Sequence, residues 1–361
     1  MKTDLIQNKI EKEFREKVNK DKRIKNAYLL VNSKKAGVDL NIAEGYTAGV
    51  PADPQQPNHL ASVGKIFTAT LIGMLFDKNE LDYNDPVLKY IDTELMEGIH
   101  IYRGKDYSDE ITIRHLLMQT SGLRDVFWPL LKRMMKEPGF RINTREALIW
   151  GKENLKPVAP PGKKLHYTDT NYYLLGFIVE KITGKKFHQA MEEMIFEPLS
   201  MDGAYMHGFS EAKKLSEYPT AGLFIKNVNL LSIQGVHELD YAGGSVIAPM
   251  EDYLKFMKAL ADGKLLNKDT LERMINDDTA MGFPALGFDY GYSVWKPKII
   301  PLLVPPGYAC WGCVGVTGAF MFFHPQSKSY IIGTFNDFAY RGKALQFMVT
   351  KIIKNLLKTE S

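Results

Sequence analysis

Cysteine is scarce in this chain: among 361 residues it occurs only as Cys310 and Cys313. Two cysteines cannot build the disulfide framework that holds small secreted domains together. The eight histidines show no paired spacing typical of metal ligands, so we expect neither a metal site nor a cofactor. A Gly-rich phosphate loop and a G-x-S-x-G turn are absent too, which argues against a P-loop enzyme and an α/β-hydrolase.

No apolar run is long enough to span a membrane, and strong net charge is lacking as well. The N-terminal segment MKTDLIQNKIEKEFREK has no signal-peptide core, and its apolar residues instead form the stripe of an amphipathic helix. We therefore expect a cytoplasmic protein without a membrane span, unless a leader has been removed from this sequence. The net charge of +4 is small, and the Lys-rich stretches at 12–25, 213–214 and 351–358 are typical of solvated helix faces, so nucleic acid is not an expected partner.

The order of the elements predicts an α/β fold of the α+β kind. A composition of 45% hydrophobic and 24% charged residues is ordinary for a globular enzyme, and 361 residues fit one domain with a large insertion. We expect strands at 27–32, 38–43, 290–295, 318–324 and 329–336, a glycine turn at 241–245, and helices within 59–76, 124–155, 170–184, 249–260 and 343–357.

Strands near both ends imply one sheet assembled from the two termini. We expect a single catalytic unit over residues 1–361, with an α/β part at about 1–75 and 240–361 and a mainly helical part at 76–239. A cleft would lie where the two parts meet.

The stretch HLASVGKIFTATLIGMLF, residues 59–76, carries the chemistry. Ser62 is followed three residues later by Lys65, and no further charge appears until Asp77. Residues three apart share a helix face, so the amine can lie beside the hydroxyl. A serine becomes a nucleophile when a base takes its proton, and burial near a helix start should lower the pKa of Lys65 toward that task. The helix start also offers backbone N–H groups to an oxyanion.

The S-x-x-K spacing alone is a weak signal. It recurs at Ser210–Lys213 and Ser293–Lys296, in polar or strand-like surroundings, and Ser62 could simply be a helix N-cap beside a surface lysine. The uninterrupted apolar run behind Lys65 favours the catalytic interpretation.

A resemblance to a known family covers nearly the whole chain. Ser62-Val63-Gly64-Lys65, followed by IFTATLIGML, resembles the first motif of the serine β-lactamase and penicillin-binding protein superfamily. The class C branch, which also includes DD-peptidases and esterases, is the most similar. Other similar segments lie at 81–90, 111–123, 161–162, 171–184 and 242–252. The resemblance implies a β-lactamase/transpeptidase-like fold, with an antiparallel sheet flanked by helices.

The second and third family motifs are altered here. Tyr-x-Asn lands on Tyr167-Thr168-Asp169, which implies that Tyr167 cooperates with Lys65 as the base while Asp169 replaces the amide that binds substrate. The third motif falls on Cys313-Val314-Gly315, so Cys313 stands where Lys or His would hold a substrate carboxylate. Gly315 would let a substrate backbone approach closely. By the same resemblance, the N–H groups of Ser62 and Val316 would form the oxyanion hole.

These features predict a serine hydrolase that forms an acyl-enzyme on Ser62, esterase- or amidase-like, acting on a substrate without a free carboxylate. The expected partner is a small ester, amide or peptide, and the sequence leaves the oligomeric state open. A β-lactamase or D-alanyl-D-alanine carboxypeptidase is the alternative within the family. A catalytically weak penicillin-binding or sensor protein is the alternative outside enzymes.

Several other residues have two interpretations. Cys310 and Cys313 have the spacing of a redox pair, although packing is the simpler explanation for two cysteines in a strand region. Cleft lining and core packing are both open for a set of histidines and aromatics: His59, His166, His237, Tyr241, Tyr292 and Trp311.

Overall fold

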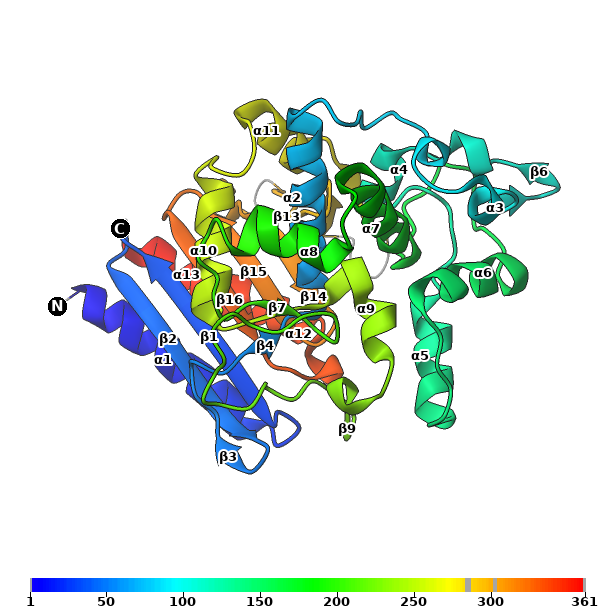
Figure 1. Ribbon diagram of the computed structural model, residues 1–361. Helices are drawn as coiled ribbons and strands as arrows, with labels where there is room; N and C mark the ends of the chain where they lie inside the picture. Colours follow the sequence, from blue (N-terminus) through cyan, green and yellow to red (C-terminus); the bar gives the residue numbers. More distant parts are fainter. Residues whose placement is uncertain (1, 283–286, 301–303, 360–361) are drawn as a thin grey trace.

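In the computed structural model, which describes residues 2–282, 287–300 and 304–359, the largest feature is a nine-stranded antiparallel sheet (Figure 1). Its order is β11-β12-β13-β14-β15-β16-β1-β2-β3. The strands are β1 (Asn26–Ser33), β2 (Val38–Thr47), β3 (Val50–Pro51), β11 (Thr279–Ala280), β12 (Phe288–Tyr290), β13 (Trp295–Pro297), β14 (Trp311–Gly315), β15 (Ala319–His324) and β16 (Ser329–Thr334). Leu30 of β1 lies opposite Ile332 of β16, so the two ends of the chain pair directly.

One face of the sheet is covered by the terminal helices. α1 (Lys2–Lys20) packs beside the C-terminal helices α12 (Lys343–Phe347) and α13 (Lys354–Leu356), which a π-helical segment (Met348–Ile353) connects. The apolar stripe of α1 is buried in the core of this face, and its members are Ile6, Ile10, Phe14 and Val18. Their spacing of four residues keeps them on one helix side, which holds α1 on the sheet.

The other face carries α2 (Gly64–Asp77) and α10 (Met250–Ala261). α2 is buried on nearly every side, and Phe67 stacks on Phe256 of α10 with ring centroids 3.6 Å apart. Aromatic stacking of this kind adds to the area that the rings bury. The helix that begins just after Ser62 is therefore fixed inside the larger core.

The remaining helices and short strands build the middle of the chain. The helices are α3 (Thr93–Met96), α4 (Ile113–Leu117), α5 (Phe127–Lys136), α6 (Thr144–Asn154), α7 (Thr170–Thr183), α8 (Phe187–Met191), α9 (Val236–Gly244) and α11 (Lys268–Asn276). The short strands are β4 (Asn58–His59), β5 (Ile101–Tyr102), β6 (Lys105–Asp106), β7 (Tyr205–Met206), β8 (Phe224–Ile225), β9 (Val228–Asn229) and β10 (Val246–Ala248). Figure 1 shows α3, α5 and α6 grouped on the side away from the sheet. None of the described helices is long and apolar enough to cross a membrane.

Most predicted elements are confirmed, and three predictions were wrong. The stretch 59–76 is not one helix, because His59 ends β4 and Ser62 lies in a 3₁₀ turn (Ala61–Val63) before α2. Residues 241–245 are not a free glycine turn but the end of α9, kinked at Tyr241, where φ is 29°. Residues 290–295 are not one strand, because a turn separates β12 from β13. The segment 124–155 contains two helices, α5 and α6.

Candidate active site

Ser62 is presented by a tight turn between β4 and α2. Ala61, just before it, has a φ of 49°, a backbone conformation that residues other than glycine rarely adopt. The N–H of Ala61 donates to Nδ1 of His59 over 3.0 Å, which helps to hold the turn in place. Strained backbone of this kind often accompanies functional side chains, because the surrounding structure must support it.

Lys65 lies one turn further along, fully buried, and its ammonium group has three acceptors. Nζ donates to Oγ of Ser62 over 3.2 Å and to the carbonyl oxygen of Gly243 over 2.8 Å. Its third contact is an ion pair with Oδ1 of Asp169. An ammonium group has three N–H donors, so all of them are used. The structure therefore brings together Ser62 and Lys65 as their spacing predicts.

The predicted lowering of the pKa of Lys65 was wrong. Burial by itself does lower the pKa, but the Asp169 carboxylate and the electron-rich Tyr172 beside the amine outweigh it, so the pKa of Lys65 is raised. An opposite charge in contact favours the charged form. The sequence argument counted the burial of Lys65 and missed its partner, which lies 104 residues away. In the resting arrangement Lys65 is a protonated amine.

Tyr167 reaches the same place from the loop before α7. Nζ of Lys65 lies 5.4 Å from the centre of the Tyr167 ring. Burial raises the pKa of the Tyr167 phenol well above its ordinary value, Cys313 and Asp169 add to this, and contact with the Ser62 hydroxyl opposes it. The phenol is therefore neutral and close to the serine.

Asp125, which the sequence analysis did not single out, holds the segment that carries Asp169. Its Oδ1 accepts the N–H of Asp169 over 2.7 Å and the hydroxyl of Thr168 over 3.2 Å. Burial, together with the nearby Asp169, raises the pKa of Asp125 to about 6. Only the three-dimensional structure could reveal this contact, because the two carboxylates lie 44 positions apart.

A cavity of about 150 Å³ opens above these groups. Ser62, Tyr167 and Asp169 line it, together with Val316, which follows β14 directly. The rest of its wall consists of His59, Ala61, Phe127, Trp128, Leu223, Leu230, Val236, Asp240, Gly243 and Thr317. Five of the sequence-predicted residues thus meet: four line the cavity, and Lys65 lies buried beneath it.

Cys313 and Gly315 are not among the residues that line the cavity. The Cys313 thiol is fully buried and donates to the carbonyl oxygen of Ser62 over 3.3 Å. Burial raises its pKa to about 12. A Cβ on Gly315 would lie 2.3 Å from the carbonyl oxygen of Leu60, so the close backbone approach at Gly315 is made by the protein's own chain.

The remaining alternatives mostly resolve to packing. Both cysteines are free, and Cys310 and Cys313 lie in the two separate cores of the sheet, which excludes a disulfide between them in this fold. Among the described residues that line the cavity, His59 is present, but the other candidates are not: His166, His237, Tyr241, Tyr292 and Trp311. Besides Tyr167, the wall of the cavity contains the aromatic side chains of Phe127 and Trp128 of α5, which lies within the helical segment expected at 124–155.

One group of side chains within the described ranges could hold a metal ion by proximity: His59, His207 and Asp240, whose ligand atoms lie within 4.8 Å of one another. The hydrogen bonding opposes this. Nδ1 of His59 accepts the Ala61 N–H, so the proton of the neutral ring is on Nε2, the nitrogen that faces Asp240. A metal would need an unprotonated Nε2 with a free lone pair. Metal-bound histidines also usually donate a hydrogen bond from the N–H of the other ring nitrogen. The donor set does not fit a metal.

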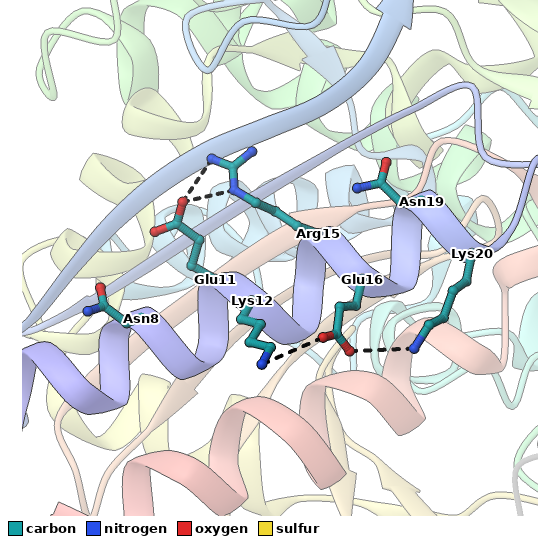
Figure 2. A pocket seen from close by; sticks show the side chains of 7 residues that line it. All are labelled: Asn8, Glu11, Lys12, Arg15, Glu16, Asn19 and Lys20. Carbon is teal, nitrogen blue, oxygen red and sulfur yellow. Dashed lines mark hydrogen bonds and ion pairs between the residues drawn. The ribbon is translucent and has the colours of Figure 1, made fainter.

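A second hollow lies on the outer surface of α1, far along the chain from Ser62 (Figure 2). Its charged side chains pair with one another, as Figure 2 shows for Arg15 with Glu11 and for Glu16 with Lys12 and Lys20. Pairs four residues apart on an exposed helix are ordinary surface contacts. This hollow is therefore not a second candidate site.

Comparisons with known proteins agree with this picture. A family model described as Beta-lactamase matches residues 16–348. PbpX of Bacillus subtilis (strain 168), a penicillin-binding protein by its name, is 27% identical over 238 residues, which are 65% of this chain and 54% of that protein. Protein flp of Staphylococcus aureus (strain MW2) is 30% identical over 171 residues, 46% of this chain and 32% of flp. The matches thus span about half or less of these curated relatives.

Solved structures share the fold over nearly the full chain. A D-stereospecific amidohydrolase from Streptomyces sp. has a TM-score of 0.75 at 22% identity and covers 94% of this chain and 98% of its own. The D-amino acid amidase from Ochrobactrum anthropi SV3 reaches 0.78 at 16% identity, with 99% of both chains covered. The octameric penicillin-binding protein homologue from Pyrococcus abyssi reaches 0.78 at 22% identity, with 97% and 77% covered. These TM-scores establish a common fold.

Proposed function

The chain belongs to the beta-lactamase family, and from that premise we propose that it is a serine hydrolase that forms an acyl-enzyme on Ser62. The observation that carries the proposal is the meeting of three groups at one cavity. Ser62 and Tyr167 line it, and Nζ of Lys65 lies 3.2 Å from the Ser62 hydroxyl oxygen. Nucleophile and base within hydrogen-bond reach are the signature of covalent catalysis.

Because Lys65 is protonated at rest, the base must first be released. The ammonium gives one proton to Asp169, and the ion pair becomes a neutral amine beside a neutral acid. Burial raises the pKa of Asp169, which favours this proton transfer. The positive charge of Lys65 lowers the same pKa and opposes the transfer. The free lone pair of Lys65 then faces Ser62. Asp169 thus acts as a proton acceptor for Lys65, in addition to any contact with substrate.

Acylation then proceeds with a balanced proton count. The Ser62 hydroxyl passes its proton to Lys65 as Oγ bonds to the substrate carbonyl carbon. Lys65, with the Tyr167 phenol as relay, returns that proton to the leaving alcohol or amine when the C–O or C–N bond breaks. A water molecule repeats the sequence and releases the acid. The backbone N–H groups of Ser62 and Val316 stabilise the oxyanion, and each such donor contributes about 3 kcal/mol.

The substrate is a small ester or amide without a free carboxylate. Among the described lining residues there are two carboxylates, Asp169 and Asp240, and no Lys or Arg. Since Asp169 is paired with Lys65, a substrate carboxylate would face the charge of Asp240 with no cation among the described lining residues to bind it. The cavity volume of about 150 Å³ suits a small acyl group.

Turnover of p-nitrophenyl butyrate tests the proposal. We expect hydrolysis that falls by about 10³-fold or more in Ser62→Ala, because the variant lacks the nucleophile of the proposed acyl-enzyme. Ser216→Ala, at an exposed position away from the cavity, is the matched control and should hydrolyse the ester at the wild-type rate. Turnover that survives Ser62→Ala would sink the assignment.

A second candidate is a penicillin-binding protein with weak turnover. Two observations favour it: the name of PbpX, and the engagement of all three N–H groups of Lys65. Intact-mass measurement after incubation with benzylpenicillin distinguishes the two. A lasting penicilloyl adduct on Ser62 without ester turnover would support this candidate, and fast release of hydrolysed penicillin would instead indicate a β-lactamase.

A further inference from the structure

Asp240 is a carboxylate in the cavity wall that the hydrolytic steps above do not use. It lies on α9, four residues before Gly244. A Cβ on Gly244 would lie 3.1 Å from the carbonyl oxygen of Ala61 and 3.7 Å from Oδ1 of Asp240. Asp240 is therefore next to the turn that presents Ser62. Its side chain is 15% exposed, which leaves it reachable from the cavity.

The neighbour of Asp240 does not neutralise it. Nε2 of His59 lies 3.3 Å from Oδ2 of Asp240, and an imidazolium there would be a counter-ion. However, Nδ1 of His59 accepts the Ala61 N–H, and an imidazolium has no acceptor nitrogen. His59 is therefore neutral. Its buried Nε2 also lacks a properly aligned hydrogen bond among the described residues, so even the dipolar contact is weak.

The other charges around Asp240 do not supply a cation either. Lys65 is paired with Asp169. Burial lowers the pKa of His207 to about 4, so this ring is neutral at physiological pH. Within the part of the chain that the structure describes, no Lys or Arg forms an ion pair with Asp240. A carboxylate with this little compensation in a mostly enclosed cavity is costly, and a cation that enters the cavity relieves the cost.

The rest of the wall indicates what accompanies the cation. Phe127, Trp128, Leu223, Leu230 and Val236 form an apolar surface in the same cavity. We propose that Asp240 binds the protonated primary amine of the substrate, and that the apolar surface holds a hydrocarbon group on the same acyl unit. This rests on the proposed function, since it defines the acyl group that Ser62 receives. The substrate ammonium acts as the counter-ion of Asp240 and donates a charge-assisted hydrogen bond to it.

A set of methyl esters that share one carbon skeleton tests the amine site. Leucine methyl ester, in D and L forms, carries the amine. N-acetyl-leucine methyl ester keeps the bulk without the charge, and methyl 4-methylpentanoate lacks the nitrogen. We expect kcat/KM to be at least about tenfold higher for a free-amine ester than for the other two. Asp240→Asn should abolish this preference, so that the free-amine esters and the neutral esters then have similar kcat/KM values.

Glu238→Gln is the matched control, because it removes one carboxylate from the same helix at a position outside the cavity. It should keep the amine preference. Equal rates for all the methyl esters, or an Asp240→Asn variant that keeps the preference or loses all three rates equally, would overturn the amine site. If p-nitrophenyl butyrate is still hydrolysed through Ser62, the proposed function stands. If no ester is hydrolysed through Ser62, both proposals fail.

Discussion

The buried ion pair of Lys65 and Asp169 should contribute to the stability of the fold as well as to catalysis. Lys65→Met keeps much of the side-chain volume but removes the charge, which leaves Asp169 without its cation. Lys65 is fully buried and the Asp169 side chain is only 14% exposed, so water cannot replace the lost partner. Breaking a buried ion pair by removing one member typically lowers the free energy of unfolding by about 3–5 kcal/mol.

A double variant distinguishes the loss of the charged partner from the loss of packing. Adding Asp169→Asn to Lys65→Met removes the stranded charge, so the double variant should recover about 1–3 kcal/mol. Lys12→Met is the control, because Lys12 and its partner Glu16 are exposed, and the free energy of unfolding should change by less than about 0.5 kcal/mol. Equilibrium unfolding in urea at pH 7 measures all four proteins.

The pH dependence provides an independent check on the same pair. Burial raises the pKa of Asp169, and Lys65 opposes that rise, so the pKa should be higher still in Lys65→Met. A carboxyl group whose pKa is higher in the folded than in the unfolded state stabilises the fold when protonated. Lys65→Met should therefore regain stability as the pH falls through the folded-state pKa. A variant as stable as the Lys12→Met control, or a double variant with no recovery, would refute this reasoning.

Three further predictions concern the groups around the pair. The pKa of Asp125 is raised to about 6, so the free energy of unfolding should decrease as the pH rises from about 4 to 6. Asp125→Asn should remove this pH dependence, which urea unfolding at several pH values measures. Gly315→Ala places a Cβ against the Leu60 carbonyl and should cost about 1–3 kcal/mol in urea unfolding, whereas Gly139→Ala, in open space, should not. Iodoacetamide should label neither buried thiol of the folded protein and leave ester hydrolysis unchanged; labelling of Cys313 with loss of activity would contradict its burial.

Contacts within one turn of chain could be predicted from the sequence. The three-residue spacing of Ser62 and Lys65 brings the two groups together, although the first of them lies in a 3₁₀ turn and not in the helix. The apolar stripe of α1 and the strands of both termini could also be predicted, because the periodicity of their apolar residues is a local feature of the sequence. Tyr167 was placed near them only through the family resemblance.

Contacts between distant segments could not be predicted in this way. The charge state of Lys65 depends on Asp169, and the tautomer of His59 depends on the backbone of Ala61. Neither contact can be recognised from the neighbouring residues in the sequence. Asp240 was missed because the glycines after it suggested a turn, whereas they allow α9 to pack closely against the start of α2. Cys313 occupies a motif position, but its side chain points beneath Ser62 and not into the cavity.

The most direct test of the central claim is the covalent adduct itself. We expect a fluorophosphonate probe to add one equivalent of mass to the protein, and peptide mapping to place it on Ser62. The adduct should be absent in Ser62→Ala and should form far more slowly in Lys65→Met, since the serine then lacks its base. A modified residue other than Ser62, or labelling of Lys65→Met at the wild-type rate, would contradict the account.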